Sequence, residues 1–114
     1  MIVVEAAIRL TDPARRESLV AESAPIQQAT RDDEVGCVVY CFAADPVEAD
    51  LIQVYELWTD EESLVAHFQH PNYTKMRELL GAAGLASAIS CKLRVDAHSP
   101  IYDEDRRPIV GFPA

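Results

Sequence analysis

The stretch DLIQVYELWTDEESLVAHFQHPNYTKM, residues 50–76, constrains the fold more than any other part of the chain. It opens with a run rich in β-branched and aromatic residues, which is typical of a strand. A helix start follows at once, since Thr59 or Asp60 is placed to cap a helix and two glutamates lie in its first turn. Pro71 then begins a second helical segment, because proline is tolerated at the first helical position. The stretch also holds the single tryptophan and two of the 3 histidines, so we expect the chemistry of the protein here.

Three further strands and one further helix are predicted around this stretch. Residues 2–10 alternate between an apolar and a mixed face, which is the two-residue period of a strand with one buried side. Asp12 and Pro13 predict the start of a helix that runs to residue 24, where Pro25 kinks or interrupts it. The run CVVYCFAAD from residue 37 and the alternating segment 87–98 predict two more strands. The order β-α-β-β-α-β predicts an α+β, ferredoxin-like fold: a four-stranded antiparallel sheet with both helices on one face.

Helical spacing predicts which side chains of the two segments after residue 60 face the core. They are Leu64, Val65 and Phe68 in the first segment and Tyr73, Met76 and Leu80 in the second. The strand at 51–58 is apolar on both faces, which predicts that both faces are covered. Since the sequence holds no third layer, a second copy of the chain is the simplest cover for the other face of the sheet. We therefore expect a homodimer packed sheet to sheet.

The chain has room for one domain, which we assign to residues 1–98, and a C-terminal tail, residues 99–114. Prolines make a regular element in the tail improbable. The tail nevertheless carries apolar side chains, so it is predicted to pack on the domain or on a partner subunit. These side chains are Ile101, Tyr102, Ile109, Val110 and Phe112.

The charge of the chain restricts its partners. With 19 acidic and 10 basic residues the net charge is −9, which would repel a nucleic acid or an anionic membrane. A neutral or apolar small molecule is the favoured partner, and a strongly anionic one is not expected. No apolar run is long enough to span a membrane and no signal-peptide pattern is present, so we expect a cytoplasmic protein.

The 3 cysteines, Cys37, Cys41 and Cys91, lie inside apolar strand-like runs. Their odd number and the lack of a C-x-x-C spacing argue against a disulfide framework and against a zinc site. They are interpreted as small buried hydrophobic residues. His67 and His70 are three positions apart, but no third ligand accompanies them, so no metal site is predicted.

Three segments, EVGCVVYCFAADP, YELWTDEESLVAHF and HPNY, resemble the antibiotic biosynthesis monooxygenase family, whose members commonly read E-P-G-C, then E-x-W-x-(D/S)-x-x-A-x-x-x-H, then x-P-H-F. The resemblance spans residues 2–95. In two places the chain departs from it: Val35 replaces the usual proline, and Asn72 stands where a second histidine is common. The positions that match are Glu34, Gly36, Cys37, Glu56, Trp58, His67 and Pro71.

The resemblance implies a dimeric α+β barrel, in agreement with the pattern of elements. It does not select a reaction, because the related proteins include cofactor-free quinol or anthrone oxygenases, haem-degrading enzymes, signal-molecule isomerases and proteins without a demonstrated reaction. The haem-degrading relatives carry an asparagine in the first strand and a histidine in the second helical segment. This chain has Glu5, Ala6 and Ala7 in the first place and TKMRELLGAAG in the second, which disfavours that branch.

A cofactor-free oxygenase needs a base, a dry apolar pocket and a group that stabilises an oxyanion. His67 is the candidate base, since the pKa of histidine lies near neutrality; the alternative is that it only caps or bonds a neighbouring element. Trp58 could form a pocket wall or belong to the core, and Asn72 could donate to the oxyanion. The candidate substrate-binding residues are Tyr40, Phe42, Tyr55, Phe68, Tyr73, Met76 and Arg94, the last of which could equally be solvated or paired.

Two functions from different classes are therefore predicted. The first is a cofactor-independent monooxygenase that oxidises a quinol-like or polycyclic phenolic small molecule with O₂ and requires no metal or organic cofactor. The second is a non-catalytic, dimeric, small-molecule-binding or stress-related module on the same fold.

Overall fold

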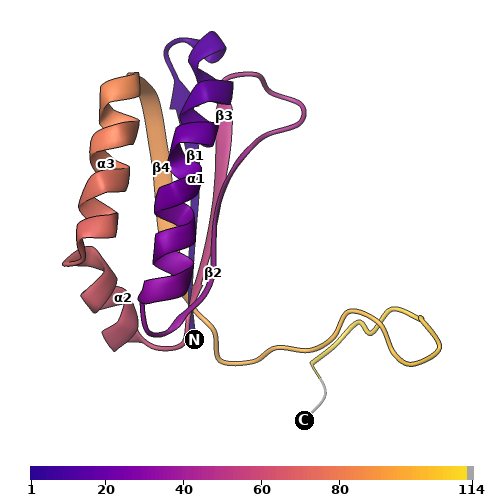
Figure 1. Cartoon of the computed structure of the whole chain (residues 1–114). Helices are drawn as coiled ribbons and strands as arrows, with labels where there is room; N and C mark the ends of the chain where they lie inside the picture. The colour runs from indigo at the N-terminus through magenta and orange to yellow at the C-terminus, as the bar shows by residue number, and fades with distance from the viewer. Residues whose placement is uncertain (113–114) are drawn as a thin grey trace.

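The computed structural model of the chain describes residues 1–112, so residues 113 and 114 of the predicted tail lie outside the described part. The strands are β1 (Ile2–Leu10), β2 (Cys37–Ala44), β3 (Leu51–Trp58) and β4 (Leu85–Arg94). The helices are the 3₁₀ helix η1 (Pro13–Arg15), α1 (Arg16–Asp33), α2 (Glu61–Phe68) and α3 (Pro71–Ala83). All strand pairs are antiparallel, in the order β2-β3-β1-β4, and the helices cover one face of the sheet (Figure 1). The predicted ferredoxin-like architecture is confirmed.

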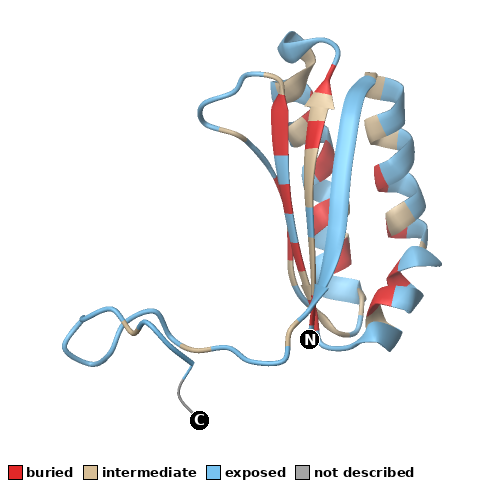
Figure 2. Cartoon of the chain, turned by 180° about the vertical axis from the view of Figure 1, so that it is seen from behind, coloured by how far each residue is buried: buried red, intermediate tan, exposed pale blue. Residues whose placement is uncertain are grey.

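The core lies between the sheet and the helices. Alternate residues of β1, β2 and β3 point into it and meet the inner sides of the helices. No helix lies over the opposite face of the sheet within one chain (Figure 2). The sequence predicted that both faces of β3 are covered, and the chain itself covers only one of them. The buried apolar residues are Ile2, Ile8, Leu10, Leu19, Tyr40, Phe42, Leu51, Ile52, Val54, Trp58, Leu64 and Met76.

The prediction that the first helix runs only to residue 24 was wrong. The side chain of Asp12 caps η1 by accepting from the backbone nitrogen of Ala14 at 3.0 Å, as expected, but α1 then continues through Pro25 to Asp33. Pro25 is exposed, and the carbonyl that loses its helical partner, that of Ala21, also belongs to an exposed residue. Water can satisfy this carbonyl, so the helix tolerates the proline.

The second half of α1 was not predicted from apolar periodicity, because the side that it turns toward the sheet is polar. The side chain of Gln27 donates to the carbonyl of Phe42 at 3.1 Å and accepts from its amide at 3.0 Å. Arg31 donates to the carbonyl of Tyr40 at 2.8 Å. These bonds occupy backbone groups of β2, which is an edge strand, and so protect that edge from pairing with another chain.

β4 presents its polar face to the helices and its apolar face to the open side of the sheet. Lys92 and Ser90 pair with Val4 and Ala6 of β1, which point toward the helices. Ile89 and Leu93 alternate with them and point the opposite way, whereas Leu85 and Ala88 line the cavity on the helix side. The strand was predicted at 87–98 but ends at Arg94, and every residue in it is exposed in the single chain (Figure 2).

The cysteines are less buried than predicted. Cys37 and Cys41 are half-buried and Cys91 is exposed, because Cys41 and Cys91 lie on the open face of the sheet. Their interpretation as buried core residues is therefore wrong for the single chain.

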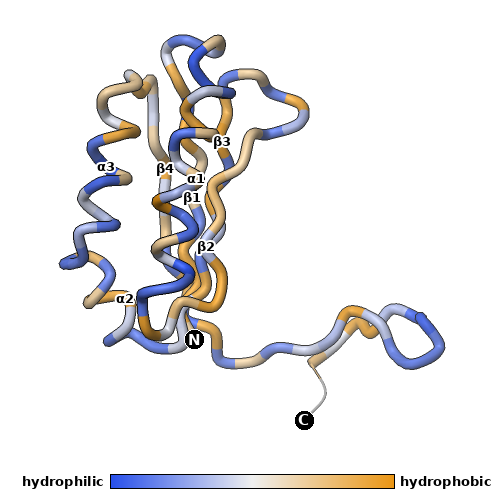
Figure 3. Tube along the Cα trace, in the orientation of Figure 1, coloured by the Kyte–Doolittle hydropathy of each residue, from blue (hydrophilic) through white to orange (hydrophobic). Residues whose placement is uncertain are grey.

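The tail leaves the domain after β4 and extends away from it (Figure 1). It turns back on itself, since Tyr102 and Pro108 form a β-bridge and the amide of Ile109 donates to the carbonyl of Ile101 at 2.7 Å. The tip of this turn is hydrophilic, with more apolar residues on either side of it (Figure 3). Val110 and Phe112 are exposed, so the tail does not pack on its own domain. Packing on a partner subunit stays a prediction.

Among residues 1–112, no helix has the length and apolar character that crossing a membrane requires.

Candidate active site

A cavity of about 740 Å³ lies between the sheet and the helices α2 and α3. Val4, Ala6 and Ile8 of β1 form much of its floor. Six of the predicted site residues line it: Tyr40, Phe42, His67, Phe68, Tyr73 and Met76. The cavity is therefore largely apolar and aromatic, as a site for an aromatic molecule would be.

Four predicted site residues do not line this cavity. Tyr55 lies on the opposite face of the sheet, since successive side chains of a strand alternate between faces. Arg94 is exposed and donates to the carboxylate of Glu61 at 2.9 Å. It is therefore paired with a carboxylate, which was the alternative to substrate binding. Trp58 and Asn72 are buried behind the cavity wall, where they contact the groups that hold His67.

The inner side of α2 differs from the prediction. Leu64 and His67 are its buried residues, whereas Val65 is 54% and Phe68 49% exposed. His67 can occupy a buried position because a buried carboxylate meets its ring. Phe68 instead stands at the edge of the cavity, 5.2 Å from the ring of Tyr73 between centroids.

Glu34 holds the His67 ring in one orientation. Its Oε1 lies 2.7 Å from Nδ1 of His67, and both side chains are 4% exposed. Its other oxygen accepts from the side-chain nitrogen of Asn72 at 3.2 Å. A carboxylate is an acceptor, so Nδ1 carries the proton in this pair and Nε2 is left with a free lone pair. Asn72 thus serves Glu34 and not the cavity.

Glu56 and Trp58 complete the network on the other side of the ring. The indole nitrogen of Trp58 donates to Oε1 of Glu56 at 3.0 Å, and this oxygen lies 4.0 Å from Nε2 of His67. The Trp58 and His67 rings pack against each other with centroids 4.6 Å apart. Glu56 lines the cavity, so a carboxyl group and an imidazole face the same space.

Burial sets the protonation of these groups. It lowers the pKa of His67, although the neighbouring Glu34 opposes this, so the imidazole is neutral at neutral pH and can accept a proton. Burial raises the pKa of Glu56 to about 7, against the effect of its bond from Trp58. It also raises the pKa of Tyr40 far above its usual value, so this phenol stays protonated. The cavity thus holds a neutral imidazole that can accept a proton and a carboxyl group that is partly protonated near pH 7.

His70 acts at the start of α3. It is the residue before the proline at which α3 begins, and its Nδ1 accepts from the backbone nitrogen of Asn72 at 3.1 Å. His70 is therefore the N-cap of α3.

A model of the antibiotic biosynthesis monooxygenase family matches residues 1–79. The chain belongs to the antibiotic biosynthesis monooxygenase family. None of the curated proteins compared with it matches the sequence.

Solved structures share the fold of this antibiotic biosynthesis monooxygenase family member. A Deinococcus radiodurans protein, for which antibiotic biosynthesis monooxygenase activity has been suggested, has a TM-score of 0.74 at 19% identity, with 90% of this chain and 100% of that chain covered. A Caulobacter crescentus protein with the same suggested activity has a TM-score of 0.71 at 17% identity, covering 81% and 87%. A Mycobacterium tuberculosis protein has a TM-score of 0.71 at 20% identity, covering 88% and 100%. At these identities the likeness concerns the fold.

Two residues of the candidate site were not assigned a role from the sequence. Glu34 and Glu56 were matched to the family motif, but neither was named as a site residue. A signal for Glu56 was present, because it alternates with Val54 and Trp58 on the inward face of a strand and a carboxylate there requires a partner. No local signal marked Glu34, whose partners, His67 and Asn72, follow it by 33 and 38 positions.

Among residues 1–112, no group of three or more histidine, cysteine, aspartate and glutamate side chains could hold a metal ion.

Proposed function

We propose that this member of the family is a cofactor-independent monooxygenase that oxidises a quinol-like or polycyclic phenolic molecule with O₂. The observation that carries the proposal is the buried bond between Glu34 and Nδ1 of His67, which leaves Nε2 of a neutral imidazole available at an aromatic cavity. Such a pair is suited to general-base chemistry, because the carboxylate orients the ring and stabilises the imidazolium that forms.

The reaction would begin with transfer of a phenolic proton to Nε2 of His67. The electron-rich phenolate then reduces O₂ directly, and the apolar walls exclude water that would compete for its charge. For a hydroquinone, one oxygen atom enters the ring and the other leaves as water, so the product is a hydroxyquinone and all four electrons come from the substrate. Glu56 is placed to return protons to the reduced oxygen, since its pKa of about 7 leaves it protonated part of the time.

O₂ consumption tests this function. The protein is incubated with a panel of hydroquinones and anthrones, in the presence of a chelator and without flavin, and the rate is compared with autoxidation in buffer. We expect consumption of one O₂ per substrate and a product that incorporates one atom from ¹⁸O₂. If no substrate is turned over and aromatic molecules still bind, the non-catalytic binding module replaces the enzyme.

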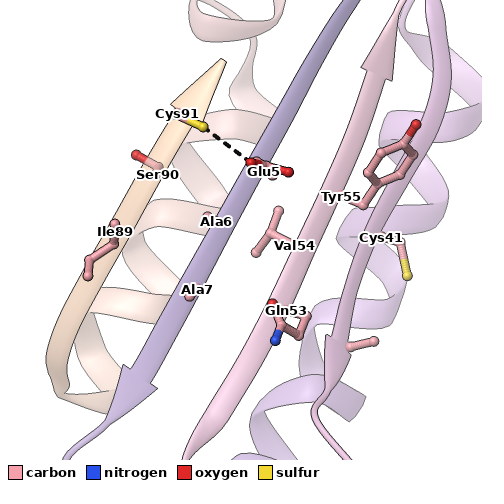
Figure 4. Close-up of a pocket in the computed structure, with 11 residues that line it drawn as sticks. Glu5, Ala6, Ala7, Cys41, Gln53, Val54, Tyr55, Ile89, Ser90 and Cys91 are labelled. Atoms are coloured by element: carbon pink, nitrogen blue, oxygen red, sulfur yellow. Dashed lines mark hydrogen bonds between the residues drawn. The ribbon is translucent and has the colours of Figure 1, made fainter. Parts of the chain in front are cut away.

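We also propose that the chain forms a homodimer through the open face of its sheet. The apolar face of β4 points there, with Ile89 74% and Leu93 46% exposed, beside Tyr55 at 44%. A shallow hollow of about 640 Å³ crosses this face, and in its floor Cys91 donates to Glu5 at 3.4 Å (Figure 4). An exposed apolar surface of this kind marks an interaction site, and a second sheet of the same shape would cover it.

Light scattering tests the assembly. The wild-type protein is expected to have twice the mass of the chain at micromolar concentration, and Ile89→Lys is expected to be monomeric because it would bury an unpaired charge in the interface. Val65→Lys introduces the same charge at an apolar α2 residue that is also exposed, and it should leave the mass unchanged. A stable wild-type monomer would contradict the proposal.

A further inference from the structure

Two basic side chains line the cavity from different elements. Arg77 lines it from α3 and Lys92 lines it from β4, and both residues are exposed. Every residue of β4 is exposed, whereas His67 and Glu56 are buried. The cavity is therefore lined both by buried residues, His67 and Glu56, and by exposed residues of α3 and β4, which include the two cations.

Neither cation is neutralised within the described part of the chain. Arg9, Arg15 and Arg94 each form an ion pair with a carboxylate, but among residues 1–112 Arg77 and Lys92 form none. The guanidinium of Arg77 lies 5.6 Å from the centroid of the Tyr73 ring, a contact that keeps it beside the cavity. In a chain of net charge −9, two unpaired cations at one cavity create a local field that attracts anions.

The register of the sheet sets the distance between Lys92 and Glu56. Lys92 pairs with Val4, and Val4 pairs with Glu56, so Lys92 and Glu56 lie in one row across β4, β1 and β3. Two strand spacings separate them, which is about 10 Å between backbones. A fused aromatic molecule with a hydroxyl group at one end and an acidic group at the other would span this distance along the apolar floor.

We propose that the substrate of this site is an anionic aromatic compound whose carboxylate is bound between Arg77 and Lys92 while its hydroxyl group reaches His67. This inference rests on the proposed function, since it takes the cavity as the substrate site, and it adds the charge and the orientation of the substrate. It reverses the expectation drawn from the net charge. The overall charge of a protein describes its long-range field, whereas a ligand responds to the side chains within a few ångströms of it.

Calorimetric titration tests the proposal without requiring turnover. It compares a charged and an uncharged derivative of the same aromatic ring system. The probes are 2-naphthoate and 2-naphthamide, which have nearly the same shape, at neutral pH and low salt. We expect 2-naphthoate to bind about tenfold more tightly, as a charge-assisted hydrogen bond at a partly exposed site would give. High salt should reduce this preference and should leave the affinity for 2-naphthamide unchanged.

Matched double variants locate the effect. Arg77→Gln/Lys92→Gln is expected to abolish the tenfold preference and to keep the affinity for 2-naphthamide. Lys75→Gln/Arg94→Gln removes the same two charges from the same helix and strand, outside the cavity lining, and should keep the preference.

Three results would overturn the proposal. Equal affinity of the wild-type protein for the two probes, or a preference that survives in Arg77→Gln/Lys92→Gln, would remove the anion site and leave the proposed oxygenase standing. Failure of both probes to bind at millimolar concentration would show that the cavity does not admit fused aromatic molecules, which would overturn this proposal and leave single-ring hydroquinones as substrates of the proposed oxygenase.

Discussion

His67→Asn is expected to lower the rate of O₂ consumption about 10²- to 10⁴-fold, the range that a positioned general base contributes. Asparagine can place its amide nitrogen near the position of Nδ1, so it can still donate to Glu34, which His67 contacts at 2.7 Å. It has no counterpart of Nε2, the nitrogen that lies 4.0 Å from the carboxyl group of Glu56, which lines the cavity. The variant therefore removes the base and preserves the buried bond. Single-turnover kinetics with the best hydroquinone of the panel would measure the loss.

Two controls separate chemistry from folding in this experiment. The affinity for 2-naphthamide should change little in His67→Asn, because the cavity walls remain. His98→Asn makes the same substitution at an exposed histidine that does not line the cavity, and it should leave the rate unchanged. Undiminished turnover in His67→Asn would show that His67 is not the base. The protein would still be an oxygenase, with another group as the base.

The fold could be predicted because its strongest signals are local. Strand alternation, the cap at Asp60 and the proline at the start of α3 act through neighbouring residues, and each of them has its expected effect. The first helix was predicted too short because the inner side of its second half is polar. There Gln27 and Arg31 bond to backbone groups at the edge of β2. An apolar stripe would leave those backbone groups unsatisfied. Periodicity detects contacts with an apolar layer, so this helix gave little signal.

The orientation of β4 illustrates a different limit. Its alternation separates Ile89 and Leu93 from Ser90 and Lys92, but the pattern cannot tell which set faces the helices. An apolar face normally points to the core of the same chain, and here it points to the open side of the sheet. The polar set therefore enters the cavity. Lys92 was not among the predicted site residues, although Arg94, two positions further along the same face, was.

The site itself was predicted in part, because aromatic residues on inward faces can be found by their spacing. Tyr40, Phe42 and Met76 all line the cavity as expected. The roles of Trp58 and Asn72 depend on the carboxylates that they contact, and the contact between Asn72 and Glu34 joins residues 38 positions apart. Such long-range pairs follow from the packing of α1 beside the sheet and not from any local pattern.

Glu56→Gln is expected to stabilise the protein increasingly as the pH rises from about 4.5 to about 7. Burial raises the pKa of Glu56 from 4.5 to about 7, so in this window the folded protein retains a proton that the unfolded chain releases. The free energy of unfolding of the wild-type protein then falls with rising pH, by roughly 3 kcal/mol over the window. Glutamine keeps an oxygen that accepts from Trp58 but cannot ionise, so the variant should not show this loss.

His67 affects the free energy of unfolding in the same pH range with the opposite sign. The Glu56 experiment must therefore compare the variant with the wild-type protein at each pH. Because burial lowers the pKa of His67 below 6.5, its contribution makes the free energy of unfolding rise with pH up to about 6.5. The wild-type curve is therefore a sum of opposed effects, and the difference between Glu56→Gln and wild type isolates the carboxyl group. Urea unfolding between pH 4.5 and 8 would give this difference, with Glu62→Gln, at an exposed position of α2, as a control that should show no such trend. A difference that stays constant across the range would show that Glu56 is not the proton-holding group of the cavity, and the return of protons to reduced oxygen would then need another donor.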